Sequence, residues 1–232
     1  MKQKYFFAFL VVLAMLVNIT GIFFEDFWLK KSGEVVFLLP LLGYYYDRLP
    51  LKNFNFKAFL LCAFLAGVLS FFDQTWYMTQ IVLGLWLGGY IFLVREAIRH
   101  TEYERGSKFT TLYFFMVVAV YLYLLSLHIL EIERRLGDNF ELALYIIYYL
   151  NIMIFAITAL VYYLNSFSKK AVFFICLTLA FIFSDVLRDM EVFYFRDLSV
   201  EIVGTLIKFA ALKLVFLFFV TPEKKLRLLH LV

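Results

Sequence analysis

Long apolar runs, each almost free of ionisable residues, follow one another from one end of the chain to the other. A helix needs about 20 such residues to cross the roughly 30 Å hydrocarbon core of a bilayer. The runs therefore predict an all-α fold, a polytopic integral membrane bundle of about eight transmembrane helices. We place these helices at residues 5–24, 34–46, 56–72, 79–94, 109–130, 141–164, 170–187 and 200–220.

The second run, residues 34–46, is the weakest of these predictions. It covers only about 18 Å at roughly 1.5 Å per residue, and Pro40 interrupts it. It is either a short tilted span or a re-entrant piece. The connections between runs are short and contain no linker rich in Pro, Gly or Ser, so we expect a single transmembrane domain over residues 1–232.

Composition excludes several classes of function. With 64% hydrophobic and 17% charged residues, a soluble domain could not bury its apolar surface. The Lys and Arg residues are scattered among the loops rather than gathered in a stripe, so we expect no nucleic-acid binding. Cys62 and Cys176 have no partner at metal or redox spacing, and no HExxH or GxSxG motif is present. We therefore expect neither a metal nor a cofactor.

The distribution of Lys and Arg predicts the orientation in the membrane. With eight spans and the N-terminus inside, 14 of these residues fall on the inner side and 6 on the outer side, and Lys208 and Lys213 lie in the last span. Cytoplasmic loops carry such an excess of positive residues. The bias predicts a multi-pass protein of the cell membrane with both termini in the cytoplasm.

Polar residues inside the runs are the candidates for function, because an ionisable group at membrane depth is expensive and usually faces the bundle interior. Asp73 and Asp185 come out at about 24 and 22 Å from the inner edge of the core, counting roughly 1.5 Å per residue from the preceding lysine. Asn18 and Lys208 reach about the same level by the same rise. We therefore predict one polar layer in the outer half of the membrane.

Each of these residues also has a purely structural interpretation. Asp73 suits a helix N-cap or a tight turn. Asp185 lies one helical turn before Arg188, which could neutralise it. Lys208 could extend its ammonium group towards the outer headgroups.

Two segments carry a resemblance to a known family. The run Ala180 to Leu187, AFIFSDVL, and the proline-containing run Leu38 to Leu42, followed by Leu49-Pro50, resemble the YhhN family of lysoplasmalogenase-like membrane proteins. Members of that family are small eight-helix enzymes of lipid breakdown. Asp73 falls where the first acidic residue of the family would end the third helix.

The resemblance implies hydrolysis of the vinyl-ether bond of a lysophospholipid-like substrate in the membrane, with release of a fatty aldehyde. A vinyl ether must be protonated on carbon, and paired carboxyl groups suit this chemistry because one donates a proton while the other stabilises the cation. The catalytic roles are assigned to Asp73 and Asp185, without deciding which is the acid. Positioning of the substrate is assigned to Asn18, Trp76, Ser184 and Lys208.

Departures from the family pattern favour a second interpretation, a non-catalytic membrane protein that binds a lipid or a partner. Phe72 replaces the usual Gly, the histidine of the fourth helix is absent near Gly89-Tyr90, and Lys208 and Lys213 add charge to the last helix. A salt bridge from Lys208 to Asp185 would favour the non-catalytic interpretation, whereas two carboxyl groups facing one cavity would favour the enzyme.

A third interpretation is a small transporter. It requires a polar path that reaches the inner side, and only Asn151 and Lys213 lie near mid-depth. The head group and chain length of a lipid substrate, and the oligomeric state, are left open by the sequence.

Overall fold

The computed structural model describes residues 2–72, 76–101, 108–133, 139–166, 168–194 and 197–223. In this part of the chain the fold is all-helical, without a strand. The α-helices are α1 (Lys2–Phe23), α2 (Phe27–Tyr45), α3 (Phe54–Leu69), α4 (Trp76–His100), α5 (Lys108–Glu133), α6 (Asn139–Ser166), α7 (Lys169–Asp189) and α8 (Leu198–Val220). Short helical turns follow three of them, η1 (Tyr46–Arg48), η2 (Ser70–Phe72) and η3 (Met190–Tyr194).

Most of these helices suit a bilayer. Among the described residues, six are long and apolar enough to cross one, namely α1, α3 with η2, α4, α6, α7 with η3, and α8. Large apolar side chains also lie exposed along the outer faces of the bundle, for example Phe9, Leu61 and Ile154. A surface of this kind requires lipid rather than water. The chain is therefore a helical membrane protein.

Each predicted apolar run corresponds to one α-helix, with ends that differ by a few residues, and the start of the second run is the one that was misplaced. Helix α2 begins at Phe27, seven residues before the predicted start, and runs through Pro40 to Tyr45. The side chain of Asp26 caps it by accepting a hydrogen bond from the Leu29 amide at 3.1 Å. Hydropathy missed this start because the charged residues Lys30 and Lys31 lie in the first turns of the helix.

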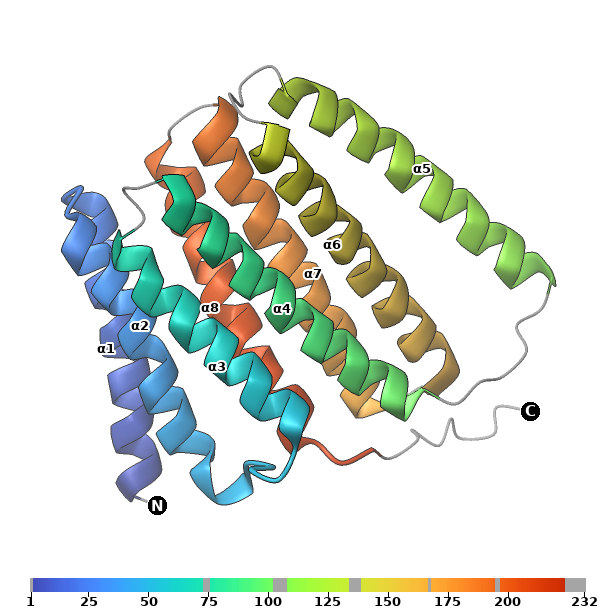
Figure 1. The fold of residues 1–232 in the computed structure, drawn as a ribbon. Helices are drawn as coiled ribbons and strands as arrows, with labels where there is room; N and C mark the ends of the chain where they lie inside the picture. Colours follow the sequence, from blue (N-terminus) through green and yellow to red (C-terminus); the bar gives the residue numbers. More distant parts are fainter. Residues whose placement is uncertain are drawn as a thin grey trace.

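The helices run up and down the bundle (Figure 1). Helix α1 packs against α2, α3 against α4, and α7 against α8, while α6 contacts both α4 and α7. Helix α5 packs against α6 at one flank of the molecule. The start of α1 and the end of α8 lie at the same end of the bundle, which we call the terminal end.

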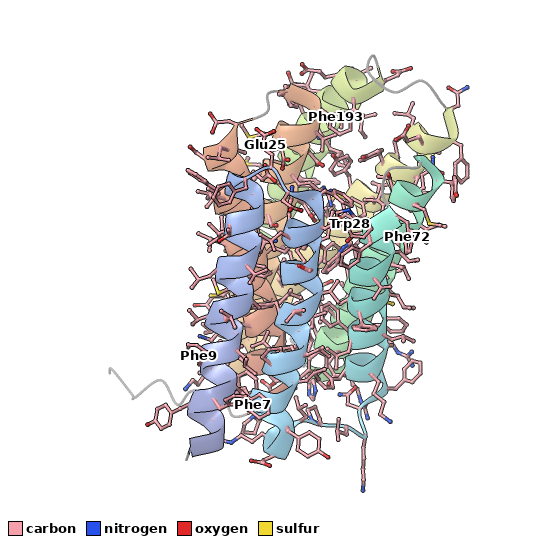
Figure 2. The ribbon with its side chains drawn as sticks, turned by 90° about the vertical axis from the view of Figure 1, so that its left-hand side faces the viewer. Phe7, Phe9, Glu25, Trp28, Phe72 and Phe193 are labelled. Atoms are coloured by element: carbon pink, nitrogen blue, oxygen red, sulfur yellow. The ribbon has the colours of Figure 1, made fainter. Side chains whose placement is uncertain are left out.

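The opposite end holds the turn between α1 and α2, and we call it the Glu25 end. Glu25, which has a left-handed φ of 54°, makes this turn. Glu25, Trp28 and Phe193 lie towards this end, whereas Phe7 and Phe9 lie towards the other (Figure 2).

Aromatic side chains fill the core of the bundle. Phe56, Phe155, Phe174, Phe209 and Phe218 are fully buried. The rings of Phe37 and Phe209 stack at 4.2 Å between centroids, which joins α2 to α8. This packing brings the charged half of α2 next to the first half of α8.

Close packing of α1 on α2 fixes the rotation of α2. A Cβ atom at Gly33 would lie 2.7 Å from the Cα of Asn18, so only glycine permits this approach. The side-chain amide of Asn18 donates to the Lys30 carbonyl oxygen at 2.7 Å. With α1 held against this side of the helix, the side chains of Lys30 and Glu34 reach a cavity inside the bundle.

Candidate functional site

A cavity of about 360 Å³ lies among α2, α3, α4, α7 and α8 towards the Glu25 end. Its volume is in the range of natural small-molecule sites, roughly 300–1,000 Å³. Apolar side chains line much of it, including Leu38, Ala63, Leu83, Phe209 and Leu212. Charged side chains from α2, α7 and α8 also line it, so the cavity offers both the apolar and the charged groups that an amphipathic ligand requires.

Asp185 of α7 lines this cavity, and both of its carboxyl oxygens contact donor groups. The hydroxyl groups of Tyr90 and Tyr148 donate to Oδ2 at 2.9 and 2.8 Å. Arg188, one helical turn further on, approaches Oδ1 with Nη1 at 3.2 Å. This pattern of donors is the one that a carboxylate accepts.

The contacts of Arg188 extend away from the cavity. Its Nη2 lies 3.2 Å from Oδ1 of the buried Asp189, and its guanidinium group lies over the ring of Tyr148 at 5.5 Å. The Tyr149 hydroxyl donates to Asp189 Oδ2 at 2.5 Å and lies 2.9 Å from His128 Nε2 on α5. A continuous hydrogen-bonded network therefore links α5, α6 and α7 behind the cavity.

Lys208 of α8 forms a second charged group in the cavity. Its ammonium nitrogen lies 3.0 Å from Glu34 Oε2 on α2 and 5.3 Å from the ring centroid of Trp86 on α4. The side chains of Glu34 and Lys208 are 13% and 27% exposed, so the ion pair is largely shielded. Shielding of this kind strengthens the attraction between the charges.

A third group closes the cavity nearer the end of the bundle. Lys30 of α2 forms an ion pair with Glu201 in the first turn of α8 and lies 3.8 Å from Glu191 in η3. These contacts tie the start of α2 to the connection between α7 and α8. The charged side chains of the lining thus meet in pairs of opposite sign.

The structure brings part of the predicted polar layer together. Asp185, Ser184 and Lys208 all line the cavity. The Ser184 hydroxyl donates to the Gly204 carbonyl oxygen at 3.2 Å. Asn18 lies instead at the contact between α1 and α2, where it is fully buried.

The remaining predicted residues lie outside what the structure describes. Asp73 falls between the described segments that end at Phe72 and begin at Trp76, and the side chain of Trp76 is likewise not described. The pairing of Asp73 with Asp185 therefore stays a prediction. Ser70, three residues before Asp73, lines the cavity.

The structural interpretation of Asp185 is supported in part, because Arg188 lies 3.2 Å from it but is shared with Asp189. Lys208 does not pair with Asp185 but with Glu34, a residue that the sequence interpretation treated only as the edge of a span. Tyr90 and Tyr148 were also missed. Helical spacing contained one signal, because Lys30 and Glu34 are four residues apart on one face of α2.

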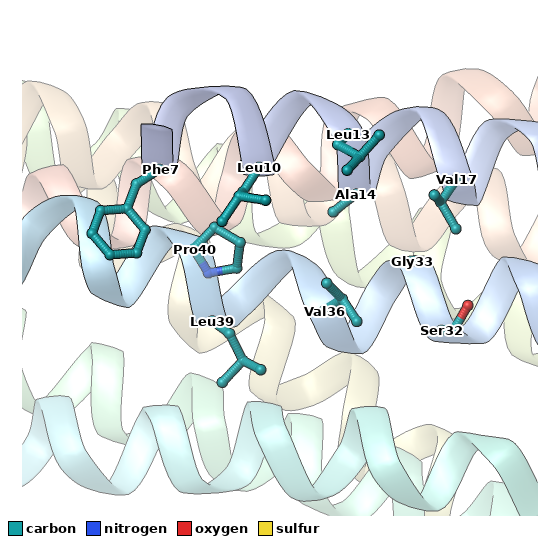
Figure 3. Close-up of a pocket in the computed structure, with 10 residues that line it drawn as sticks. All are labelled: Phe7, Leu10, Leu13, Ala14, Val17, Ser32, Gly33, Val36, Leu39 and Pro40. Atoms are coloured by element: carbon teal, nitrogen blue, oxygen red, sulfur yellow. The ribbon is translucent and has the colours of Figure 1, made fainter. Parts of the chain in front are cut away.

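Two other features of the bundle are less suited to chemistry. The groove between α1 and α2 is lined by apolar side chains with Ser32, and its described lining carries no titratable group (Figure 3). A buried cluster at the terminal end joins Glu96 to the amide groups of Asn53 and Asn55, both at 2.7 Å, and to His100 at 3.1 Å. These contacts satisfy both Glu96 oxygens and tie α3 to α4.

No protein-family model matches the chain, and neither the curated proteins nor the solved structures contain a significant match.

Replacing Arg188 with Met should destabilise the protein more than removing the whole charged group. The single variant leaves the carboxyl groups of Asp185 and Asp189 adjacent without their cation. Breaking a buried ion pair costs about 3–5 kcal/mol, and we expect about 2 kcal/mol here because water in the cavity screens the charges. Thermal unfolding in detergent measures the loss.

The matched control combines Arg188→Met with Asp185→Asn and Asp189→Asn. This variant has no uncompensated charge and should unfold nearer to the wild type than the single variant does. A triple variant that is less stable than Arg188→Met would contradict the role assigned to these ion pairs.

Proposed function

We propose that this protein binds a single-chain amphipathic lipid in the cavity and hydrolyses it there, as a lysoplasmalogenase-type enzyme. The observation that carries the proposal is the Asp185 carboxyl group, which lines the cavity beside apolar side chains and is fixed by Tyr90, Tyr148 and Arg188. Preorganised groups of this kind, aimed at the point where charge develops, are typical of catalytic sites.

The shape and polarity of the cavity support a lipid ligand. The apolar side chains of Leu38, Leu83 and Leu212 suit an acyl or alkenyl chain, and the charged side chains of the lining suit a head group. In our proposal α1 to α8 all cross the membrane, with both termini in the cytoplasm. The Glu25 end then faces outwards, and the ligand comes from the outer leaflet.

The proposed reaction begins with transfer of a proton to the vinyl carbon distal to the ether oxygen. The resulting oxocarbenium ion takes up water, which loses a proton, and the hemiacetal so formed breaks down to a fatty aldehyde and the glycerol alcohol. Asp185 is the carboxylate that stabilises the cation and orients the water. Asp185 and Asp189 together carry two negative charges and Arg188 one positive charge, so this cluster keeps one net negative charge. In this assignment Asp73, the other predicted carboxyl group, is the acid, a choice that the sequence alone left open.

The second candidate is the non-catalytic lipid-binding protein. It is favoured by the internal pairing of the cavity charges, because Asp185 pairs with Arg188, Glu34 with Lys208 and Glu201 with Lys30. Ion pairs of this kind also neutralise charged side chains in a cavity that only binds its ligand. The two candidates agree on the ligand and differ on whether Asp185 acts on it.

The isosteric change Asp185→Asn should lower aldehyde release from a purified lysoplasmalogen by at least about 100-fold, since positioned acid–base groups contribute roughly 10²–10⁴ to rate. Aldehyde production in detergent micelles is measured through a coupled dehydrogenase. Binding of the same lipid should persist because the cavity walls are unchanged.

The control is Asp47→Asn, the same change at an exposed site in η1. It should leave turnover unchanged. Equal turnover by Asp185→Asn and wild type would rule out the catalytic role, while lipid binding without turnover by the wild type would establish the second candidate.

Site-directed labelling tests the proposed orientation. In a background with Cys62→Ala and Cys176→Ala, Glu25→Cys should react with a membrane-impermeant maleimide on intact cells. Asp47→Cys should react only after permeabilisation, because α2 separates these two exposed positions. The opposite pattern would place the Glu25 end in the cytoplasm, and labelling of both positions on intact cells would mean that α2 does not cross.

A further inference from the structure

The ammonium group of Lys208 is bound in the cavity as a ligand would be. A carboxylate, Glu34, lies on one side of it at 3.0 Å, and the face of Trp86 lies on another at 5.3 Å to the ring centroid. Proteins recognise ligand ammonium groups with these same two elements, an aromatic face and a carboxylate.

The surroundings of Lys208 are built by separate helices and packed in place. Glu34 comes from α2 and Trp86 from α4. The Trp86 ring packs against Tyr90 and Phe181, with centroids 6.1 and 5.9 Å away. Lys208 itself reaches this position on a flexible four-carbon stem from α8, so it is the adaptable member of the group.

We propose that Glu34 and Trp86 form a binding site for an ammonium group, and that Lys208 fills this site and thereby determines specificity. A ligand with a cationic head group is excluded from this part of the cavity by charge repulsion and by occupancy. The head group that lies beside Lys208 is then anionic or uncharged. This inference rests on the proposed function only in requiring that the cavity binds an amphipathic ligand.

The other cations that line the described part of the cavity have contacts of their own. Lys31 of α2 lies with its ammonium nitrogen 5.8 Å from the ring centroid of Phe27. Lys30, on the same helix as Glu34, forms an ion pair with Glu201 and lies 3.8 Å from Glu191. Arg188 is engaged by Asp185 and Asp189 on α7. Loss of the Lys208 ammonium group therefore vacates a place that is in contact with both the Glu34 carboxylate and the Trp86 ring.

The test is the change Lys208→Met, which keeps an unbranched apolar stem and removes the charge. Purified variants in a neutral maltoside detergent are titrated calorimetrically with decyltrimethylammonium and with decyl phosphate. The variant should bind decyltrimethylammonium at least about tenfold more tightly than the wild type does, and decyl phosphate less tightly. Lys208→Arg keeps a cation in place and should show no gain.

Two controls separate occupancy from a general change of charge. Lys213→Met makes the same charge change on an exposed position of α8 and should show no gain. Adding Trp86→Leu to Lys208→Met should abolish the gain. If Lys208→Met is poorly folded, Glu34→Gln with Lys208→Met leaves no unpaired charge and should keep part of the gain through Trp86.

The inference would be overturned if Lys208→Met, and the double variant Glu34→Gln with Lys208→Met, bind decyltrimethylammonium no more tightly than the wild type does. The same gain in Lys213→Met would also overturn it. Failure of the proposed function has a different signature, in which the wild type binds neither decyl phosphate nor a lysoplasmalogen. A gain of decyltrimethylammonium binding in Lys208→Met supports the inference even when no hydrolysis is detected.

Discussion

Pairing of charges within an apolar bundle is the constraint on which the rest of this structure depends. A lone charge at membrane depth is costly, and it becomes tolerable when a partner from another helix neutralises it. Lys30 and Glu34 of α2 meet Glu201 and Lys208 of α8 in this way. These ion pairs neutralise the charges of α2 inside the bundle, and their side chains also line the cavity.

The behaviour of α2 explains which part of the fold could be read from the sequence. Apolar runs locate α1 and α3 to α8 because lipid-facing helices are apolar around most of their surface. The first half of α2 faces charged partners rather than lipid, so hydropathy alone placed its start at residue 34 instead of Phe27. Only the spatial neighbour α8 makes those charges intelligible, and a single sequence does not reveal that neighbour.

The sequence predicted those residues of the candidate site that share one depth in the membrane. Counting residues along the helices grouped Asp185 with Lys208, and both line the cavity. The direction in which a side chain points around its helix axis does not follow from such a count. Asn18, at a similar estimated depth, therefore turned out to pack against α2, whereas Glu34 and Tyr148 were missed as partners of the site.

The central claim is that Asp185 and a second carboxyl group act on a lipid in one cavity. The most direct measurement is a crystal structure of the protein with a bound single-chain lipid, in which the separation of the Asp73 and Asp185 carboxyl groups is determined. We expect both groups on the cavity, about 5–9 Å apart, the separation over which paired carboxyl groups act in glycoside hydrolases. An Asp73 side chain directed away from the cavity, or a cavity that stays empty of lipid, would contradict it.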